Sequence, residues 1–151
     1  MATHQNHDLV NRFFDEVCNQ RKLQAANELF SAGHIYHDPQ IPAAPGPDGM
    51  KQVVQTYQNA FPDAHWHVIE TIVAGNDIIT RWKGTGTHKN ELSGIPPTGK
   101  KASVDGIWIH RIKNGKIAES WNIWDTLGLL QQLGVVPVMQ QETASSAASR
   151  N

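Results

Sequence analysis

The hydrophobic residues of this chain change their spacing near residue 64, and this change constrains the fold more than any other feature. Before that point, apolar residues recur every three or four positions, which is typical of helices with one buried side. After it, apolar and polar residues alternate, which is typical of strands. Helices followed by consecutive strands predict an α+β domain, with the helices packed on one face of a curved antiparallel sheet.

The first half of the chain predicts three helices. The first begins at Asp8, a good N-cap, and ends near Gln20, after a flexible leader of residues 1–7. A short helix covers Leu23 to Phe30, and a third runs from Pro47 to Phe61. Residues 35–39 between them indicate a short extended segment, followed by a proline-rich loop.

The second half predicts four strands in an antiparallel meander and a closing helix, Leu127 to Leu133. Gly75–Asn76–Asp77 and Asn114–Gly115 are tight-turn signals that join the strands in pairs. A broad loop of residues 89–100 separates the two pairs. We expect residues 8–139 to form one domain and residues 140–151 a mobile tail. The predicted strands cover residues 64–73, 77–87, 104–112 and 116–124.

Length and charge narrow the class of protein. A chain of 151 residues suits a single domain with its own core. The formal net charge of −1 gives no footprint for a phosphate backbone, so we expect no nucleic-acid partner. The apolar runs are too short to span a membrane, and no signal peptide is visible. With one cysteine, Cys18, no intrachain disulfide forms, and we expect a cytoplasmic protein.

Both faces of the predicted sheet carry apolar residues. In the third strand Trp108 lies on one face, while Ile107 and Ile109 lie on the other. The helices can cover only one face, and a second apolar face is costly to leave in water. We therefore predict a homodimer through the outer face. The alternative is a long loop or the tail folded over it.

Eight histidines and five tryptophans are many for this length, and several fall on one predicted surface. Trp108 and His110 share a face of the third strand, and Ser120, Asn122 and Trp124 share a face of the fourth. Because the Asn114–Gly115 turn pairs these strands, both sets can line one surface. Polar groups between aromatic walls are typical of a small-molecule site. The alternative for His110 is a hydrogen-bonded core histidine.

Three motifs of the second half carry a family resemblance: GIPPTGK at residues 94–100, RIKNGKI at 111–117 and WDTLGLLQQLG at 124–134. With RFFDEV and YHDP upstream, they resemble the SnoaL-like polyketide cyclases, often called ester cyclases. That resemblance implies a nuclear-transport-factor-2-like fold, a cone-shaped α+β barrel with a cavity between the helices and the sheet. It also implies intramolecular aldol ring closure without metal or organic cofactor, using an aspartate and a pocket histidine.

Carried onto this chain, the resemblance places the catalytic aspartate at Asn122 and the helping histidine at Trp108. A second family histidine falls on Ser120. An amide can orient a carbonyl or enolate by hydrogen bonds, but it cannot remove a proton at neutral pH. Any acid/base catalysis must therefore use other residues.

Asp125 and His37 are the candidate proton carriers. Asp125 follows two tryptophans that could exclude water and raise the pKa of its carboxyl, although an aspartate there is equally a good N-cap for the closing helix. His37 and Asp38 precede the proline loop, which lies at the cavity mouth in the family fold. Adjacent residues of an extended segment point to opposite sides, so only one of the two can face the cavity.

Arg81 could bind a substrate carboxylate or stabilise an enolate, or form an ion pair at the subunit interface. His88 begins the broad loop and could contribute to a lid. His65 and His67 share a strand face, but no third ligand has a comparable pattern, so we expect no metal site. The predicted catalytic set is Asp125, His37, His110 and Asn122, and the predicted substrate-binding set is Trp108, Trp124, Ser120, Tyr36, Asp38, Arg81, Trp82 and His88.

We therefore expect an enzyme of the ester-cyclase type that performs cyclisation, isomerisation or hydration on a small, carbonyl-rich, apolar substrate without a cofactor. The alternative is a protein of the same fold that binds a small molecule without converting it, since the family's aspartate is replaced by Asn122. A dimeric scaffold with a vestigial cavity is a third hypothesis.

Overall fold

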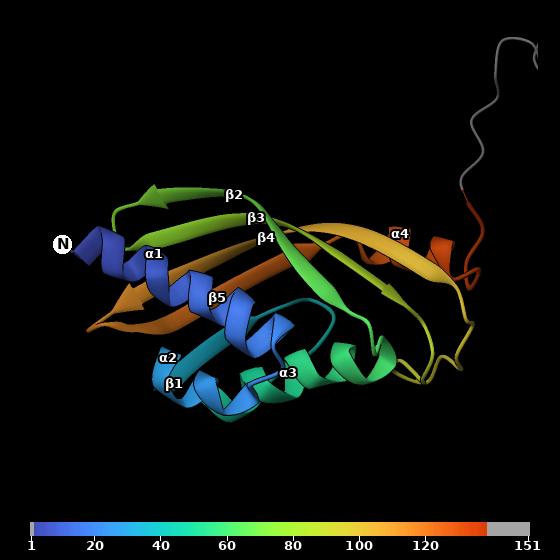
Figure 1. Cartoon of the computed structure of the whole chain (residues 1–151), viewed down its shortest axis with the longest axis horizontal. Helices are drawn as coiled ribbons and strands as arrows, with labels where there is room; N and C mark the ends of the chain where they lie inside the picture. Colours follow the sequence, from blue (N-terminus) through green and yellow to red (C-terminus); the bar gives the residue numbers. More distant parts are fainter. Residues whose placement is uncertain (1, 139–151) are drawn as a thin grey trace, which may run out of the picture.

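A computed structural model describes residues 2–138 of the chain (Figure 1). Helix α1 continues directly into a π-helical segment, η1, and a 3-10 turn, η2, leads into the short helix α2. The bounds are α1 Ala2–Arg12, η1 Phe13–Asn19, η2 Leu23–Ala25, α2 Ala26–Leu29, β1 Phe30–His37, α3 Pro47–Ala60, β2 His65–Ala74, β3 Asp77–Thr87, β4 Lys101–Lys113, β5 Lys116–Trp124 and α4 Thr126–Gln132.

The strands form one mixed sheet in the order β1-β5-β4-β3-β2. Strands β2 to β5 make the predicted antiparallel meander, with turns at Gly75–Asn76 and Asn114–Gly115. Asn114 and Gly115 both have positive φ angles, 53° and 73°, as a tight two-residue hairpin turn requires. The α+β architecture predicted from the sequence is confirmed.

Strand β1 is the main difference from the prediction. The helix expected over residues 23–30 ends at Leu29, and an eight-residue strand follows it from Phe30 to His37. This strand pairs in parallel with β5, with Ile35 opposite Glu119 and His37 opposite Trp121. The pairing joins segments more than 80 residues apart, so no local turn signal reveals it.

The N-terminal helix also begins earlier than predicted, at Ala2 rather than after Asp8. Residues 2–7, expected to form a flexible leader, are therefore helical, and the Asn6 side chain is buried. The predicted mobile tail, residues 140–151, lies outside the described residues. No helix within residues 2–138 is long and apolar enough to cross a membrane.

The core lies between the inner face of the sheet and the helices α1, α2 and α3, which Figure 1 shows together on one side of the sheet. Phe13 is fully buried and contacts Phe14, Phe30 and Trp108 edge to face, with ring centroids 5.2–5.4 Å apart. These edge-on contacts between η1, β1 and β4 hold the helical layer against the sheet.

Polar side chains fasten the π-helical segment to its neighbours. Gln58 of α3 donates from Nε2 to the carbonyls of Val17 and Cys18, at 3.0 and 2.8 Å. Asn19 accepts from the backbone N–H of Trp66 at 2.8 Å and donates to its carbonyl at 2.9 Å. The Gln58 bonds satisfy carbonyls at the end of the π-helix, and the Asn19 bonds satisfy backbone groups of Trp66 in β2. Together they tie η1 to α3 and β2.

Candidate functional site

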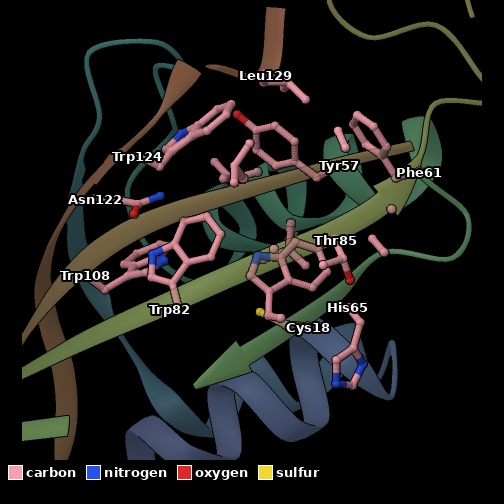
Figure 2. A pocket seen from close by; sticks show the side chains of 18 of the residues that line it. Cys18, Tyr57, Phe61, His65, Trp82, Thr85, Trp108, Asn122, Trp124 and Leu129 are labelled. Carbon is pink, nitrogen blue, oxygen red and sulfur yellow. The ribbon is translucent and has the colours of Figure 1, made fainter. Parts of the chain in front are cut away.

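A mostly apolar cavity lies between α3, η1 and the inner face of the sheet (Figure 2). The centre of a water-sized sphere can move within about 70 Å³ of the cavity, and all the empty space out to and including the open mouth measures about 660 Å³. Trp82, Trp108 and Trp124 come from three neighbouring strands, and Tyr57 and Phe61 come from α3 and its end. The remaining lining residues are Phe13, Cys18, Val53, Val54, Ala64, His65, Trp66, Gly84, Thr85, Gly86, Ala102, Val104, Asn122 and Leu129.

The strand register explains why the predicted aromatic and polar residues meet here. Trp108 lies directly opposite Asn122, and Gly106 lies opposite both Trp82 and Trp124. Because side chains alternate along a strand, these residues all point to the inner face. The prediction that Trp108, Asn122 and Trp124 share one surface is therefore confirmed, and Trp82 joins them.

Two glycines make room for the indole of Trp82. A Cβ atom on Gly106 would lie 2.5 Å from Cε2 and Cζ2 of Trp82, and one on Gly84 would lie 2.9 Å from Cζ3. The indole therefore lies flat against the backbone of β3 and β4. A larger residue at either position would push the indole into the cavity, so these glycines keep the hollow open.

Asn122 is held by a chain of hydrogen bonds that leads away from the cavity. Its Nδ2 donates to the Tyr36 hydroxyl at 3.2 Å, and that hydroxyl donates to Oδ2 of Asp38 at 2.6 Å. Burial and the bond to Asp38 raise the pKa of Tyr36, so the phenol keeps its proton. Tyr36 and Asp38, predicted to bind substrate, do not line the cavity and instead contact it through Asn122.

Three buried polar atoms of the cavity wall have no hydrogen-bond partner among the described residues: Nε1 of Trp82, Nε1 of Trp108 and Oδ1 of Asn122. The exposed fractions of these side chains are only 4%, 4% and 5%. An unpaired buried donor or acceptor costs about 1–3 kcal/mol, so such groups are rare without a function. The residues of the wall therefore contain two donors and one acceptor that are unpaired among the described residues.

His110 lies beneath the cavity rather than in its wall. Its ring stacks on Trp108 with centroids 4.8 Å apart and planes 5° apart, and Phe13 and Phe14 contact it edge to face. Burial, with a smaller effect of nearby His34, lowers the pKa of His110 to about 3. The imidazole is neutral at pH 7, and Trp108 separates it from the hollow. His110 is therefore a core histidine, as the alternative stated, but neither ring nitrogen has a hydrogen-bond partner within residues 2–138.

Ser120 also faces inward below the cavity, and its partner is a residue that the sequence analysis missed. The Ser120 hydroxyl and Nε2 of His34 are 2.8 Å apart, and both side chains are fully buried. Burial lowers the pKa of His34 to about 4. His34 belongs to β1, and because that strand was not predicted, the orientation of His34 could not be predicted either.

His37 points to the outer surface. Its Nε2 lies 2.6 Å from Oε2 of Glu119, and its ring stacks on Trp121 at 5.1 Å. The adjacent residue Tyr36 is the one that faces inward, as the opposed directions of neighbouring strand residues require. The prediction that His37 carries protons in the cavity is therefore not supported by its position.

Asp125 is the N-cap of α4, which was the alternative to a catalytic role. Its Oδ1 accepts a hydrogen bond from the backbone N–H of Gly128 at 2.8 Å, which caps α4. The residue is exposed and does not line the cavity, so the two tryptophans before it do not exclude water from it, and the N-cap alternative is confirmed.

Arg81 and His88 also lie away from the cavity. Arg81 is exposed on the outer face, with its Nε 3.5 Å from a carboxylate oxygen of Glu70, so it faces away from the hollow. His88 is fully buried at the end of β3, where Nδ1 accepts from the backbone N–H of Thr98 at 3.2 Å. It anchors the loop of residues 88–100 rather than reaching into the cavity.

The helix side of the cavity and its mouth could not be predicted from the sequence. Tyr57 and Phe61 share a helix face and line the cavity, although apolar residues at that spacing usually indicate core packing. His65 lies at the rim and is the single histidine or carboxylate among the residues that line the described cavity. The alternating strand pattern placed His65 on a surface, but could not show that the surface borders an opening.

Comparison with known proteins identifies the family. The model of the SnoaL-like polyketide cyclase family matches residues 8–133. The chain belongs to this family. It is 32% identical over 132 residues to the aklanonic acid methyl ester cyclase DnrD of Streptomyces peucetius, covering 84% of this chain and 89% of that protein. It is 30% identical over 132 residues to the aklanonic acid methyl ester cyclase DauD of Streptomyces sp. strain C5, with 84% and 80% covered.

Solved structures of other proteins share the fold. TsrD from Streptomyces laurentii superposes with a TM-score of 0.80 at 23% identity, covering 88% of this chain and 97% of that one. IdmH from Streptomyces antibioticus gives a TM-score of 0.72 at 32% identity, covering 87% and 100%. The nuclear-transport-factor-2-like architecture expected from the SnoaL-like motifs is thus confirmed.

Proposed function

We propose that this SnoaL-like protein catalyses ring closure, without a cofactor, of a neutral and largely apolar substrate that carries carbonyl groups. The observation that carries the proposal is the aromatic cavity with Asn122 in its wall, in a chain that is similar to two aklanonic acid methyl ester cyclases. Lysine, arginine, aspartate and glutamate are absent from the described lining, which favours an uncharged ester over a free acid.

The groups that the cavity offers match such a substrate. The indole N–H groups of Trp82 and Trp108 can donate to carbonyl oxygens, including one that becomes negatively charged as an enolate forms. Asn122 orients the substrate but cannot take its proton. A substrate with several rings would extend from the cavity into its open mouth.

His65 is our candidate for the proton carrier, because it is the single histidine or carboxylate in the described lining. Its ring points away from the tryptophans in Figure 2 and must turn toward the hollow to act. In this mechanism the His65 imidazole removes a proton from the carbon beside a carbonyl, and the resulting enolate carbon attacks a second carbonyl of the same molecule. The new alkoxide then takes the proton back from the imidazolium. The product has the same composition as the substrate, and no oxidant or reductant is needed.

Turnover of aklanonic acid methyl ester, followed by liquid chromatography and mass spectrometry, tests this function. We expect a product of unchanged mass, and a rate at least about tenfold lower in His65→Gln because general-base catalysis contributes factors of 10² or more. His67→Gln, which alters the neighbouring imidazole 4.4 Å away, is the matched control and should retain the rate. Equal rates in both variants would exclude His65 as the base.

Asn122→Asp tests whether the cavity retains the geometry of the family reaction. A carboxylate at this position can accept a proton, so the variant should cyclise the ester faster than the natural chain. Absence of turnover in both proteins, with this and related carbonyl substrates, would indicate a different chemistry.

We also propose that the chain forms a homodimer through the outer face of the sheet. Ile35, Ile72, Ile107 and Ile123 expose 51%, 52%, 47% and 62% of their surface there. Exposed isoleucines on four of the five strands form an apolar surface that a second copy would remove from water. Within residues 2–138 no loop or helix covers these side chains, so the alternative of a covering loop has no support there.

A further inference from the structure

We infer that Tyr36 and Asp38 are positioning residues, which determine that the Asn122 amide presents its oxygen rather than its nitrogen to the cavity. The site then selects ligands that donate a hydrogen bond, such as a hydroxyl or an enol, at that point. The inference rests on the proposed function only in that the cavity must bind an organic molecule.

The direction of each hydrogen bond follows from the chemistry of Asp38, which ends the series of hydrogen bonds farthest from the cavity. Both oxygens of the Asp38 carboxylate accept: Oδ1 from the backbone N–H of Gln40 at 2.7 Å, and Oδ2 from the Tyr36 hydroxyl at 2.6 Å. Because a carboxylate has no proton to give, Tyr36 must donate to it. The Tyr36 oxygen can then only accept, so Asn122 must turn Nδ2 toward it, at 3.2 Å.

At the cavity end of this hydrogen-bond series, the Asn122 side-chain oxygen is an acceptor without a donor among the described residues. With Nδ2 committed to Tyr36, Oδ1 of Asn122 remains buried and unpaired in the cavity wall. A ligand hydroxyl that donates to Oδ1 satisfies it, whereas a ligand of the same shape without the proton leaves it unsatisfied. A buried acceptor left unpaired disfavours such a complex by about tenfold or more.

The substitution Asp38→Asn should reverse the donor and acceptor roles along these hydrogen bonds. The backbone N–H of Gln40 still requires an acceptor, so the new amide would give its oxygen to Gln40 and its NH₂ to Tyr36. The Tyr36 hydroxyl would then donate inward to Asn122, whose oxygen turns away from the cavity. The wall would present a donor in place of an acceptor.

Equilibrium dialysis with 1-naphthol and 1-fluoronaphthalene measures this selectivity. The two probes are nearly equal in size and differ in the single hydroxyl proton. We expect the natural chain to bind 1-naphthol at least about tenfold more tightly, and Asp38→Asn to lose or reverse this preference. Tyr36→Phe, which removes the hydroxyl that links Asp38 to Asn122 without reversing the hydrogen bonds, should reduce the preference for 1-naphthol. Asp105→Asn, an exposed aspartate on β4 whose carboxylate lies 3.7 Å from Lys83, is the matched control and should keep it.

A change in the ratio of the two affinities distinguishes a positioning role from a general loss of structure. A site that is merely loosened binds both probes more weakly but keeps the same order of affinity. Equal binding of the two probes by the natural chain, or an unchanged preference in Asp38→Asn, would overturn the inference while leaving the cavity as a binding site. Binding of neither probe would overturn the inference and the proposed function together. An intact preference with no turnover of any ester would remove the proposed function alone.

Discussion

At the scale of single residues, this site is defined by polar groups that the fold leaves without partners. Within residues 2–138, Trp82, Trp108 and Asn122 line the cavity with unpaired atoms, and His110 is stacked on Trp108 with both ring nitrogens unpaired. Alternation along β4 and β5 was enough to predict that Trp108, His110 and Asn122 share a face. It could not show that the stacked indole of Trp108 shields His110 from the hollow, because that depends on side-chain packing.

His34 and His110 should make the protein sensitive to acid. Their folded-state pKa values are about 4 and about 3, against 6.5 for an ordinary histidine. Between these values the unfolded chain binds protons that the folded chain cannot, so the free energy of unfolding decreases as the pH falls below 6.5. From pH 7 to pH 5 we expect a loss of about 2 kcal/mol for each imidazole, measured by urea denaturation.

The variant His110→Leu removes one of these two groups and should recover about half of that loss. His37→Gln, which removes an exposed imidazole, is the control and should keep the steep decline. A decline as steep in His110→Leu as in the natural chain would show that His110 is not held neutral by burial.

At the scale of secondary-structure elements, the connections decide which polar residues reach the cavity. The parallel strand β1 places Tyr36 inside and His37 outside, and α4 makes Asp125 a cap. The sequence predicted an extended segment at residues 35–39 but not its partner, because parallel pairing of distant segments leaves no local pattern. Without the partner, the inward-facing residue could not be chosen.

Two substitutions at Asp125 separate capping from catalysis. Asp125→Ala should lower the free energy of unfolding by about 1 kcal/mol, because the N–H of Gly128 loses its acceptor. Asp125→Asn keeps an oxygen for the cap, so it should be nearly as stable as the natural chain and retain turnover. Loss of turnover in a stable Asp125→Asn protein would restore Asp125 as a catalytic base.

Gly106→Ala tests whether the two glycines packed against Trp82, Gly84 and Gly106, make room for its indole. The added methyl group would lie 2.5 Å from the indole and 2.7 Å from Cβ of Trp124, so we expect destabilisation of about 1–3 kcal/mol and weaker ligand binding. Gly33→Ala in β1, where no heavy atom lies within 4 Å of the new methyl group, is the matched control. Thermal denaturation of the two variants should differ clearly; equal melting temperatures would mean that the indole has room to move.

At the scale of the whole molecule, a helical layer and a curved sheet enclose one face and leave the other in solvent. The change from helical to strand periodicity near residue 64 predicted this arrangement, and the SnoaL-like motifs predicted the family. The extent of the cavity could not be predicted, because Tyr57 and Phe61 from α3 meet the tryptophans of three strands only after the layers pack.

The exposed outer face gives a prediction about assembly. Replacing Ile107 and Ile123 together with lysine should convert a dimer into a monomer, since charged side chains on both faces would have to be buried together. Size-exclusion chromatography with light scattering measures the mass. Leu127→Lys on α4, also 53% exposed but away from the sheet, should leave the assembly unchanged. A natural chain that is monomeric at all concentrations would contradict the proposal.

The central claim is that the hollow under the three tryptophans receives the substrate. A crystal structure of the protein with aklanonic acid methyl ester bound tests it most directly. We predict ligand density between Trp82, Trp108 and Trp124, with a ligand oxygen within hydrogen-bond distance of Asn122. Density confined to the outer face, with the hollow still empty and the indoles unmoved, would contradict the account.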